Sequence, residues 1–331
     1  KGESFDKRLT KIVKDLKSII SKSIVIINSI DKNTQLIVNA INHQLSNYGN
    51  TISITNPSKL KQGNTNKIDA LISDMQNGKV DALITYNVNP SYSLANSKEF
   101  NDALKNVSLK ISTSQHHDET AHLMDYVCPD SHNLESWGDA NPKHGVFSLM
   151  QPTITPLFNT RQFQESLLSW MNKSDYQAFQ KNYWISKGVD WNKSLHDGYF
   201  NLNESPIKVK RFTDNSISVA KKNNESIELE IYETVALGDG RQANNPWLQE
   251  LPDPITRACW DNYLTISAST ADKLGLSNWN VANGAMNGSV VNITDGENIL
   301  ENVPVMITPG QAQNTAVSYT HLTLPTSHNV G

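Results

Sequence analysis

One stretch of sixteen residues, "VCPDSHNLESWGDANP" from Val127 to Pro142, contains most of the side-chain types that enzymes use for catalysis. Cys128 and His132 could form a nucleophile–base pair, because a neighbouring imidazole can take the proton of a thiol. Cys128 lies between Val127 and Pro129, however, with no cationic neighbour in sequence to stabilise a thiolate. We therefore expect Cys128 to be a buried structural thiol.

The same stretch holds three carboxylates, Asp130, Glu135 and Asp139, two of which could act as a general acid and a general base. Carboxylates in a glycine-containing loop more often cap helices or accept hydrogen bonds from backbone N–H groups. Because spacing alone does not bring two of these groups together, we predict no catalytic residue in this stretch.

A second polar run, "QHHDETAH", holds five candidate metal ligands, namely His116, His117, Asp118, Glu119 and His122. Adjacent residues in a strand point to opposite faces, and the separation of His117 and His122 is not a helical ligand spacing. We therefore expect a polar loop that enters a short helix with Asp118 or Thr120 as its cap, and we predict no metal site.

The elements that must position these residues alternate between two patterns in the first third of the chain. Helical periodicity is present at 5–20, 33–49, 66–78 and 97–106. Short β-branched runs predict strands at 23–28, 51–55, 81–86 and 108–114. Strands separated by helices form a parallel sheet, and ligands of such sheets bind at the carboxyl ends of the strands. The loops after Tyr86 and Ser114 leave those ends.

Two domains joined by a linker are predicted. Residues 1–200 form an α/β domain with a parallel, Rossmann-like sheet, and it includes two further helices near 160–171 and 174–184. Residues 201–226 are polar and lack a sustained period, so we interpret them as a linker or surface excursion. Residues 227–317 contain short strands divided by Gly, Asn and Pro, which predicts a mostly β, barrel-like domain.

The ends of the chain look like those of a fragment. The first residue is Lys1 rather than Met, so we expect the native chain to continue upstream. "SYTHLTLPTS", from Ser318, breaks a running strand pattern and resembles a peptide encoded by sequencing-adapter DNA. We therefore expect residues 318–331 to be a non-native tail without a role in fold or function.

Composition excludes several classes of function. The 331 residues carry a net charge of −4 with the signs interspersed, so there is no broad basic surface for nucleic acid. The apolar run near Ser23 is too short to cross a bilayer. The chain has two cysteines, Cys128 and Cys259, and it cannot by itself supply a four-cysteine iron–sulfur or zinc site.

Two tryptophans lie in a proline-rich loop, "NNPWLQELPDPITRACWDNYL", which follows a turn with Gly238 and Gly240. No phosphate-binding helix follows these glycines, so a simple turn is favoured. Trp247 and Trp260 could belong to the core or to a docking surface. We expect the loop to face another subunit or a further region of the same chain.

Three stretches together resemble the molybdopterin oxidoreductases of the dimethyl-sulfoxide-reductase superfamily: "ALITYNVNPSYS", "ETAHLMDYVCPDSHNLESWGDA" and "PDPITRACWDNYLTIS". The resemblance extends from Lys1 to about Ala316 and is greatest for the molybdopterin-like region of the large iron–sulfur subunit of bacterial alternative complex III. "SWGDANPKHGVFSLMQPTITPLFNTRQ" and "GDGRQANNPWLQELPDP" resemble that branch in particular.

The resemblance implies a fold, a role and a place in the cell. The α/β domain would flank a pterin cofactor in catalytic relatives, and the β domain would be a truncated double-psi type barrel. The complex oxidises quinol in a respiratory chain at the periplasmic face of the bacterial inner membrane. Partners would be other subunits and a ferredoxin-like region of the same chain, which would carry the iron–sulfur clusters beyond residue 331.

The departures from the family pattern suggest a non-catalytic scaffold. Catalytic relatives usually show Gly-Thr/Ser-Asn-Pro after the third strand, whereas this chain has Asn87-Val88-Asn89-Pro90. A side chain fills the space that glycine leaves free, and a hydroxyl is lost. We therefore expect no bound cofactor at the vestigial crevice positions, which are Asn87, Asn89, Pro90, Thr120 and Glu135. The alternative is a cofactor-binding enzyme, such as a polysulfide or thiosulfate reductase, which would hold molybdopterin there. A soluble module that binds another ligand in the crevice is a third possibility.

Overall fold

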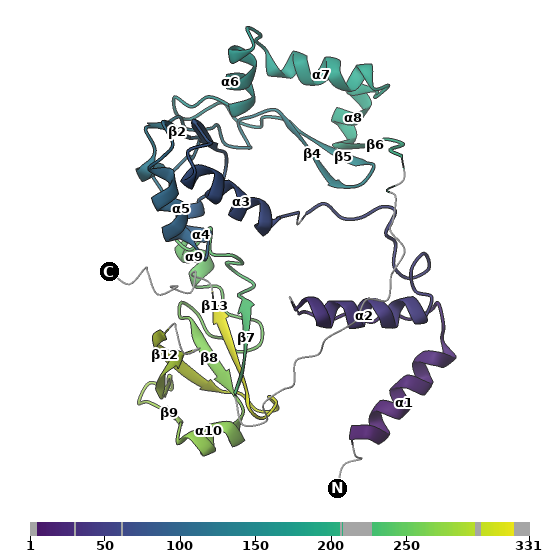
Figure 1. Cartoon of the computed structure of the whole chain (residues 1–331), viewed down its shortest axis with the longest axis vertical. Helices are drawn as coiled ribbons and strands as arrows, with labels where there is room; N and C mark the ends of the chain where they lie inside the picture. The colour runs from purple at the N-terminus through teal and green to yellow at the C-terminus, as the bar shows by residue number, and fades with distance from the viewer. Residues whose placement is uncertain are drawn as a thin grey trace. The chain divides into compact units, whose positions relative to one another are not determined.

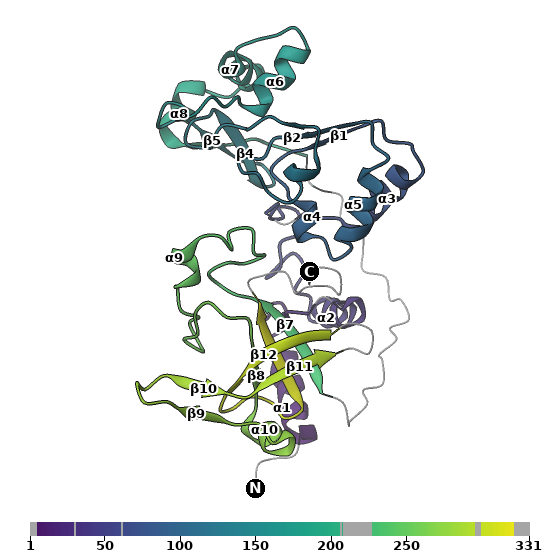
Figure 2. The ribbon, with the colours of Figure 1, turned by 90° about the vertical axis from the view of Figure 1, so that its left-hand side faces the viewer.

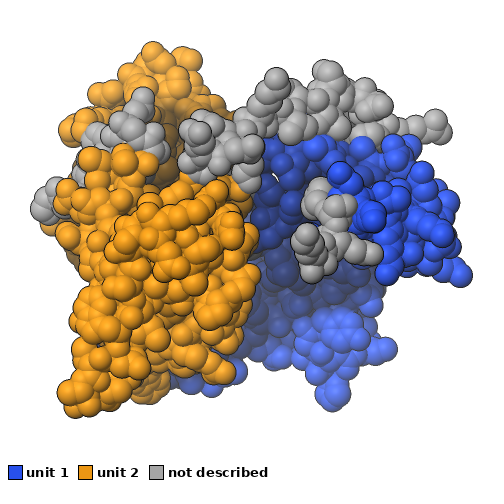
Figure 3. Space-filling model, turned by 90° about the horizontal axis from the view of Figure 1, so that it is seen from below, with its two compact units in different colours: residues 1–64, 130–222 blue, residues 65–129, 223–331 orange. Residues whose placement is uncertain are grey.

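The computed structural model describes residues 5–29, 31–60, 62–205, 207, 227–294 and 299–320. These residues form two compact units, each assembled from two stretches of the chain (Figure 3). One unit combines 1–64 with 130–222, and the other combines 65–129 with 223–331. The division between 222 and 223 falls inside the predicted linker 201–226, and the two predicted domains stay a prediction. Most of the predicted linker 201–226 and the end of the predicted tail, 321–331, lie outside the described residues.

The second unit begins with a small α/β part. Its strands are β1 (Ala82–Thr85), β2 (Leu109–Ser112) and β3 (Tyr126–Val127), which pair in parallel in the order β1-β2-β3. Its helices are α3 (Thr65–Gln76), α4 (Pro90–Ser93) and α5 (Ser97–Leu104), and a 3-10 helix, η1, spans Ala121–Leu123. The parallel sheet predicted from residues 81–86 and 108–114 is confirmed for these strands.

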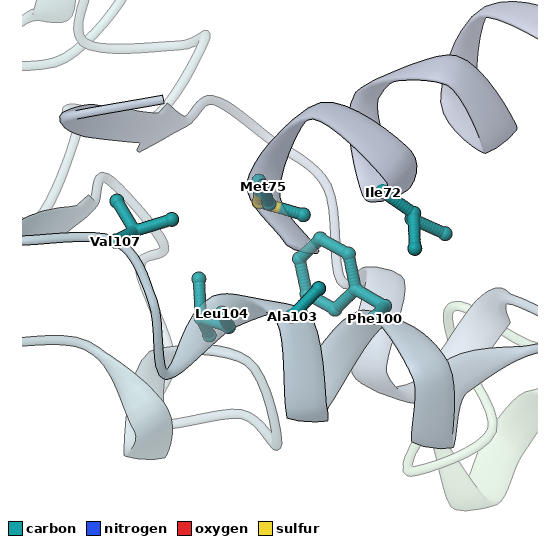
Figure 4. Close-up of a cluster of buried hydrophobic side chains, with 6 residues drawn as sticks. All are labelled: Ile72, Met75, Phe100, Ala103, Leu104 and Val107. Atoms are coloured by element: carbon teal, nitrogen blue, oxygen red, sulfur yellow. The ribbon is translucent and has the colours of Figure 1, made fainter. Parts of the chain in front are cut away.

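Apolar residues at helical spacing make the core of this part. Met75 and Ile72 from α3 meet Phe100 and Leu104 from α5, and Val107 closes the cluster before β2 (Figure 4). Figure 1 shows α3 and α5 side by side, as their periodicity requires. This core fixes the positions from which the loops after β1 and β2 leave the sheet.

The rest of the second unit is a mixed five-stranded sheet in the order β11-β12-β8-β13-β7. Its strands are β7 (Glu228–Glu233), β8 (Tyr263–Ile266), β11 (Val290–Thr294), β12 (Ile299–Ile307) and β13 (Thr315–Thr320). The helices α9 (Pro246–Gln249) and α10 (Ala268–Leu274) and a hairpin of β9 (Asn278–Asn280) and β10 (Met286–Gly288) complete it (Figure 2).

The five-stranded sheet can be compared with the predicted barrel and with the predicted start of the foreign tail. The mixed α/β fold class is confirmed, whereas closure of the strands into a barrel stays a prediction, since β11 and β7 are edge strands of the described sheet. β13 passes the predicted start of the foreign tail: Ser318 is buried, and residues 315–320 pair with β7. The strand therefore continues three residues beyond the expected boundary.

The first unit contains an antiparallel sheet, β4-β5-β6, formed by β4 (Gly138–Lys143), β5 (Val146–Met150) and β6 (Tyr199–Asn201). Three helices follow β5, namely α6 (Phe163–Trp170), α7 (Tyr176–Ser186) and α8 (Trp191–Asp197). Trp184, Trp191 and Phe200 form the buried core, with Trp137 and Phe147 packed against them. Two other aromatics of α7, Phe179 and Tyr183, are exposed.

The N-terminal stretch of this unit corrects the sequence prediction. Helices α1 (Phe5–Ser18) and α2 (Lys32–Gln44) are present, but α2 ends before Gly49. The predicted strands at 23–28 and 51–55 are absent from the described sheets. The buried Asn42 side chain instead binds both backbone groups of Val25, at 3.0 and 2.7 Å, and so takes the place of a neighbouring strand.

Candidate functional site

The candidate site lies at the carboxyl ends of β1 and β2, where the loops after Tyr86 and Ser114 leave the sheet. Asn87 adopts a left-handed backbone conformation with φ of 52°, which asparagine tolerates better than most residues. Asn89 precedes α4, and Pro90 occupies its first turn. A turn is therefore present at Asn87, and the Val88 side chain beside it is 53% exposed.

A single amide group joins the two loops. The Asn89 Oδ1 atom accepts hydrogen bonds from the Thr120 hydroxyl at 2.7 Å and from the Thr120 N–H at 3.2 Å. The Asn89 Nδ2 atom donates to the Glu119 carboxylate at 2.7 Å. The Thr120 Oγ1 atom in turn accepts from the Ser91 N–H at 3.0 Å, and Thr120 is fully buried. The polar groups of this edge are thus paired with one another.

The loop from Ser114 to Thr120 is held by a second carboxylate. Asp118 accepts from the Ser114 hydroxyl and from the Ala121 N–H, both at 2.7 Å, so it caps η1 as the sequence predicted. His117 and His122 meet edge-to-face with their ring centroids 5.6 Å apart. Across the residues that the structure describes, no group of three or more His, Cys, Asp or Glu side chains is placed to hold a metal ion.

Of the five predicted crevice positions, the structure brings Asn87, Asn89, Pro90 and Thr120 together in one unit, and places Glu135 in the other. The Glu135 carboxylate accepts from the Leu157 N–H and the His132 N–H, each at 3.0 Å. These backbone hydrogen bonds, that from Leu157 foremost, hold the pKa of Glu135 below its usual range. Glu135 therefore holds residues 132 and 157, the two ends of one loop, close together.

This arrangement predicts an acid-sensitive loop. Because the pKa of Glu135 is lowered in the folded chain, its stabilising effect is complete above the ordinary value of 4.5 and is lost as the pH falls through the lowered value. We expect hydrogen-exchange protection of the Leu157 and His132 amides, corrected for intrinsic rates, to fall as the pH is lowered below 4.5. Glu135→Gln should flatten this dependence. Protection that stays constant would show that the carboxylate does not hold the loop.

The other two carboxylates of the opening stretch also serve as acceptors. Asp130 accepts from the Phe163 N–H at 2.8 Å and so holds the first residue of α6. Asp139 accepts from the Trp184 indole at 2.8 Å and from the Gln180 amide at 3.3 Å, and joins β4 to α7. Asp130 thus accepts from a backbone N–H group, as the sequence favoured, whereas the donors to Asp139 are side chains.

The prediction of a buried thiol at Cys128 is wrong, because the side chain is exposed. β3 ends at Val127, and the Cys128 N–H makes one further ladder bond to the Ser112 carbonyl at 2.8 Å. The residue therefore follows the end of the strand and does not lie within the sheet.

The two tryptophans of the proline-rich loop are exposed to solvent. Trp247 is 83% exposed on α9, whose first N–H groups are capped by the Asn245 side chain. Trp260 is half-exposed and has a left-handed backbone, with φ of 69°. The stretch with Gly238 and Gly240 is a turn, as predicted, and the Gly240 carbonyl accepts from the Tyr92 hydroxyl of α4 at 3.5 Å.

Comparison with known proteins matches part of the chain to a family. The sequence profile of the molybdopterin oxidoreductase family matches residues 13–163. This match places that region of the chain in the molybdopterin oxidoreductase superfamily, as the sequence resemblance predicted.

Two particular proteins are similar to this chain. The menaquinone reductase molybdopterin-binding-like subunit of Nitratidesulfovibrio vulgaris (strain Hildenborough) is 35% identical over 92 residues, which are 27% of this chain and 13% of that protein. Acetylene hydratase from Pelobacter acetylenicus aligns in structure over 76% of this chain and 39% of its own, with a TM-score of 0.48 and 16% identity. This chain therefore corresponds to only a small part of its curated relative.

None of the helices in the described parts of the chain combines the length and apolar character that a membrane-spanning segment needs.

Proposed function

We propose that this chain is a non-catalytic, molybdopterin-like scaffold region of a quinone-linked electron-transfer complex, specifically alternative complex III. The family match at residues 13–163 and the similarity to a menaquinone reductase subunit support the quinone-linked role. The relative is itself described as molybdopterin-binding-like. The observation that carries the scaffold role is the closed hydrogen-bond network around Asn89.

The network disfavours a pterin cofactor that ends in a pyrophosphate. Phosphate groups are bound by free backbone N–H groups at close range, usually beside glycine. Here the Thr120 and Ser91 N–H groups are already taken by side chains, at 3.2 and 3.0 Å. The Glu119 carboxylate lies at the same edge and would repel a phosphate. Asn87 and Val88 add side chains where catalytic relatives have glycine and a hydroxyl.

The partners follow from the same proposal. Other subunits and a ferredoxin-like region of the same chain would surround this scaffold at the periplasmic face of the inner membrane. Iron–sulfur clusters would be held by that region, beyond residue 331. The exposed Trp247 and Trp260 suit a docking surface, because rigid aromatic side chains lose little entropy when they are buried at an interface.

Cofactor analysis of the intact purified complex tests the proposal. We expect far less than one molybdenum or tungsten atom per chain by elemental analysis, and no oxidised-pterin fluorescence after acid extraction. Iron and acid-labile sulfide should be present in the same sample, which controls for loss of cofactors during purification. Stoichiometric molybdenum or tungsten together with pterin would establish the alternative, a cofactor-binding oxidoreductase such as a polysulfide or thiosulfate reductase.

A further inference from the structure

Helix α1, labelled near the N-terminus in Figure 1, has an apolar face that is exposed to solvent. Leu9, Ile12, Val13 and Leu16 recur at the spacing of one helix face. Leu9, Ile12 and Val13 are each at least 42% exposed, and Leu16 is half-buried. Amphipathic helices usually bury such a face, so the exposed face calls for an apolar surface that covers it.

The opposite face of α1 is basic. The helix contains five basic and two acidic residues, which gives it a net charge of +3. Lys7, Lys11 and Lys14 recur at i, i+4 and i+7 on the side away from the apolar face, and Arg8 and Lys17 lie on either side of that face. The ion pairs among the described residues join other side chains, so these five cations are exposed and unpaired.

This distribution of charge favours a negatively charged partner. Like charges one helical turn apart repel one another, so a negative surface beside α1 would stabilise the helix. The whole chain has a net charge of −4, and its attraction to a negative surface therefore depends on α1. Salt screens charges beyond about 8 Å, so α1 itself must lie at that surface.

Two kinds of partner combine an apolar surface with negative charge, namely an acidic groove of a protein and a bilayer that contains anionic phospholipids. Binding to proteins is usually dominated by a few anchors, most often tryptophan, tyrosine or arginine, that fill shaped pockets. From Leu9 to Leu16 the apolar face has only aliphatic side chains. Arg8 and Lys17 can lay their methylene stems along this face while their charged ends reach headgroups. A basic, amphipathic helix of this kind is typical of helices that lie in the interface of a membrane.

We propose that α1 binds the surface of a bilayer that contains anionic phospholipids. The helix lies in the plane of the interface, with Leu9, Ile12 and Val13 against the acyl chains and the basic side chains near the phosphates. The Ser21 N–H donates to the Leu45 carbonyl at 2.8 Å, which holds the end of the α1 segment to the end of α2. The inference goes beyond the proposed function and does not depend on it, because a cofactor-binding enzyme would have the same helix.

Flotation of the chain of residues 1–331 with lipid vesicles tests the lipid preference. We expect binding to phosphatidylcholine vesicles that contain about a quarter of phosphatidylglycerol, and about tenfold weaker binding to phosphatidylcholine alone. Binding to the anionic vesicles should fall as the salt concentration rises, because the attraction is screened. Equal binding to both kinds of vesicle, or binding to neither, would overturn the proposal.

A matched pair of substitutions tests the apolar face. Ile12→Glu should weaken binding to the anionic vesicles about tenfold, because it places a negative charge in the face that contacts the bilayer. Ile255→Glu is the control, since Ile255 is 72% exposed, lies outside α1 and undergoes the same change of charge. Neither variant should lower the thermal midpoint, because both side chains are exposed. Equal weakening by the two variants would contradict the proposed binding face.

Photo-crosslinking tests the orientation of the helix and the identity of its partner. A photo-crosslinking amino acid at Leu9 should label lipid acyl chains in the anionic vesicles, whereas the same group at Lys14 should label them severalfold less. Equal labelling from the two positions would overturn the orientation. In native membranes the group at Leu9 should again label lipid, as mass spectrometry can show. A cross-link to a peptide of another protein in place of lipid would overturn the membrane surface in favour of a protein groove.

Discussion

Replacing Trp184 with alanine is expected to lower the free energy of unfolding by about 3–5 kcal/mol. The side chain is buried and packs against Phe147 and Phe200, with ring centroids 4.9 and 4.8 Å apart. Its indole N–H also donates to Asp139 at 2.8 Å, so the substitution removes packing and leaves a carboxylate oxygen with one partner fewer. Urea denaturation followed by far-UV circular dichroism measures the effect.

The matched control is Trp170→Ala on the neighbouring helix α6. Trp170 is 58% exposed, so its loss should change the free energy of unfolding by only about 0.5 kcal/mol or less. A comparable loss in both variants would show that the aromatic cluster around Trp184 is not the core of this unit.

Asn89→Ala is expected to cost about 2–6 kcal/mol of stability, although Asn89 lies in a surface loop. The substitution leaves the N–H and the hydroxyl of the fully buried Thr120 without their acceptor, at a cost of about 1–3 kcal/mol for each group. The denaturation experiment used for Trp184 measures this loss, and hydrogen exchange at the Thr120 amide should report it locally.

Glu119→Gln is the control for the same network. Glu119 is exposed and accepts one hydrogen bond from Asn89, so an amide oxygen in its place should cost less than about 1 kcal/mol. The comparison also bears on function, because a residue kept to bind a cofactor can often be replaced without loss of stability. A neutral Asn89→Ala variant would therefore argue against the scaffold role.

The sequence predicted the elements that carry strong local patterns. Helical periodicity located α3 and α5, and β-branched runs located β1 and β2. The run at 23–28 is also rich in β-branched residues, but it forms no strand of the described sheets. A strand needs a neighbouring strand to bind its backbone, and at Val25 the Asn42 side chain binds the backbone instead. The β4–β5 hairpin was missed because "GDANPK" has little strand propensity. Its register is held by a turn at Gly145, where φ is 74°.

The sequence predicted where the site lies, but it did not predict the hydrogen bonds between its residues. The resemblance selected Asn87, Asn89 and Pro90, and the left-handed backbone at Asn87 agrees with a turn built for glycine. Thr120 was also selected, but no spacing rule predicts that its hydroxyl binds an amide 31 residues away. Cys128 was misjudged because its burial depends on where β3 ends.

The interleaved course of the chain has a consequence for synthesis on the ribosome. One unit needs residues 130–222 to join residues 1–64, so the first helices leave the ribosome long before their partners exist. Until then residues 1–64 lack the later stretch of their unit, and such an incompletely folded region is a target for chaperones. For the same reason, no single cut in the gene separates the units, and an expression plasmid for either would have to join two distant segments with a new linker.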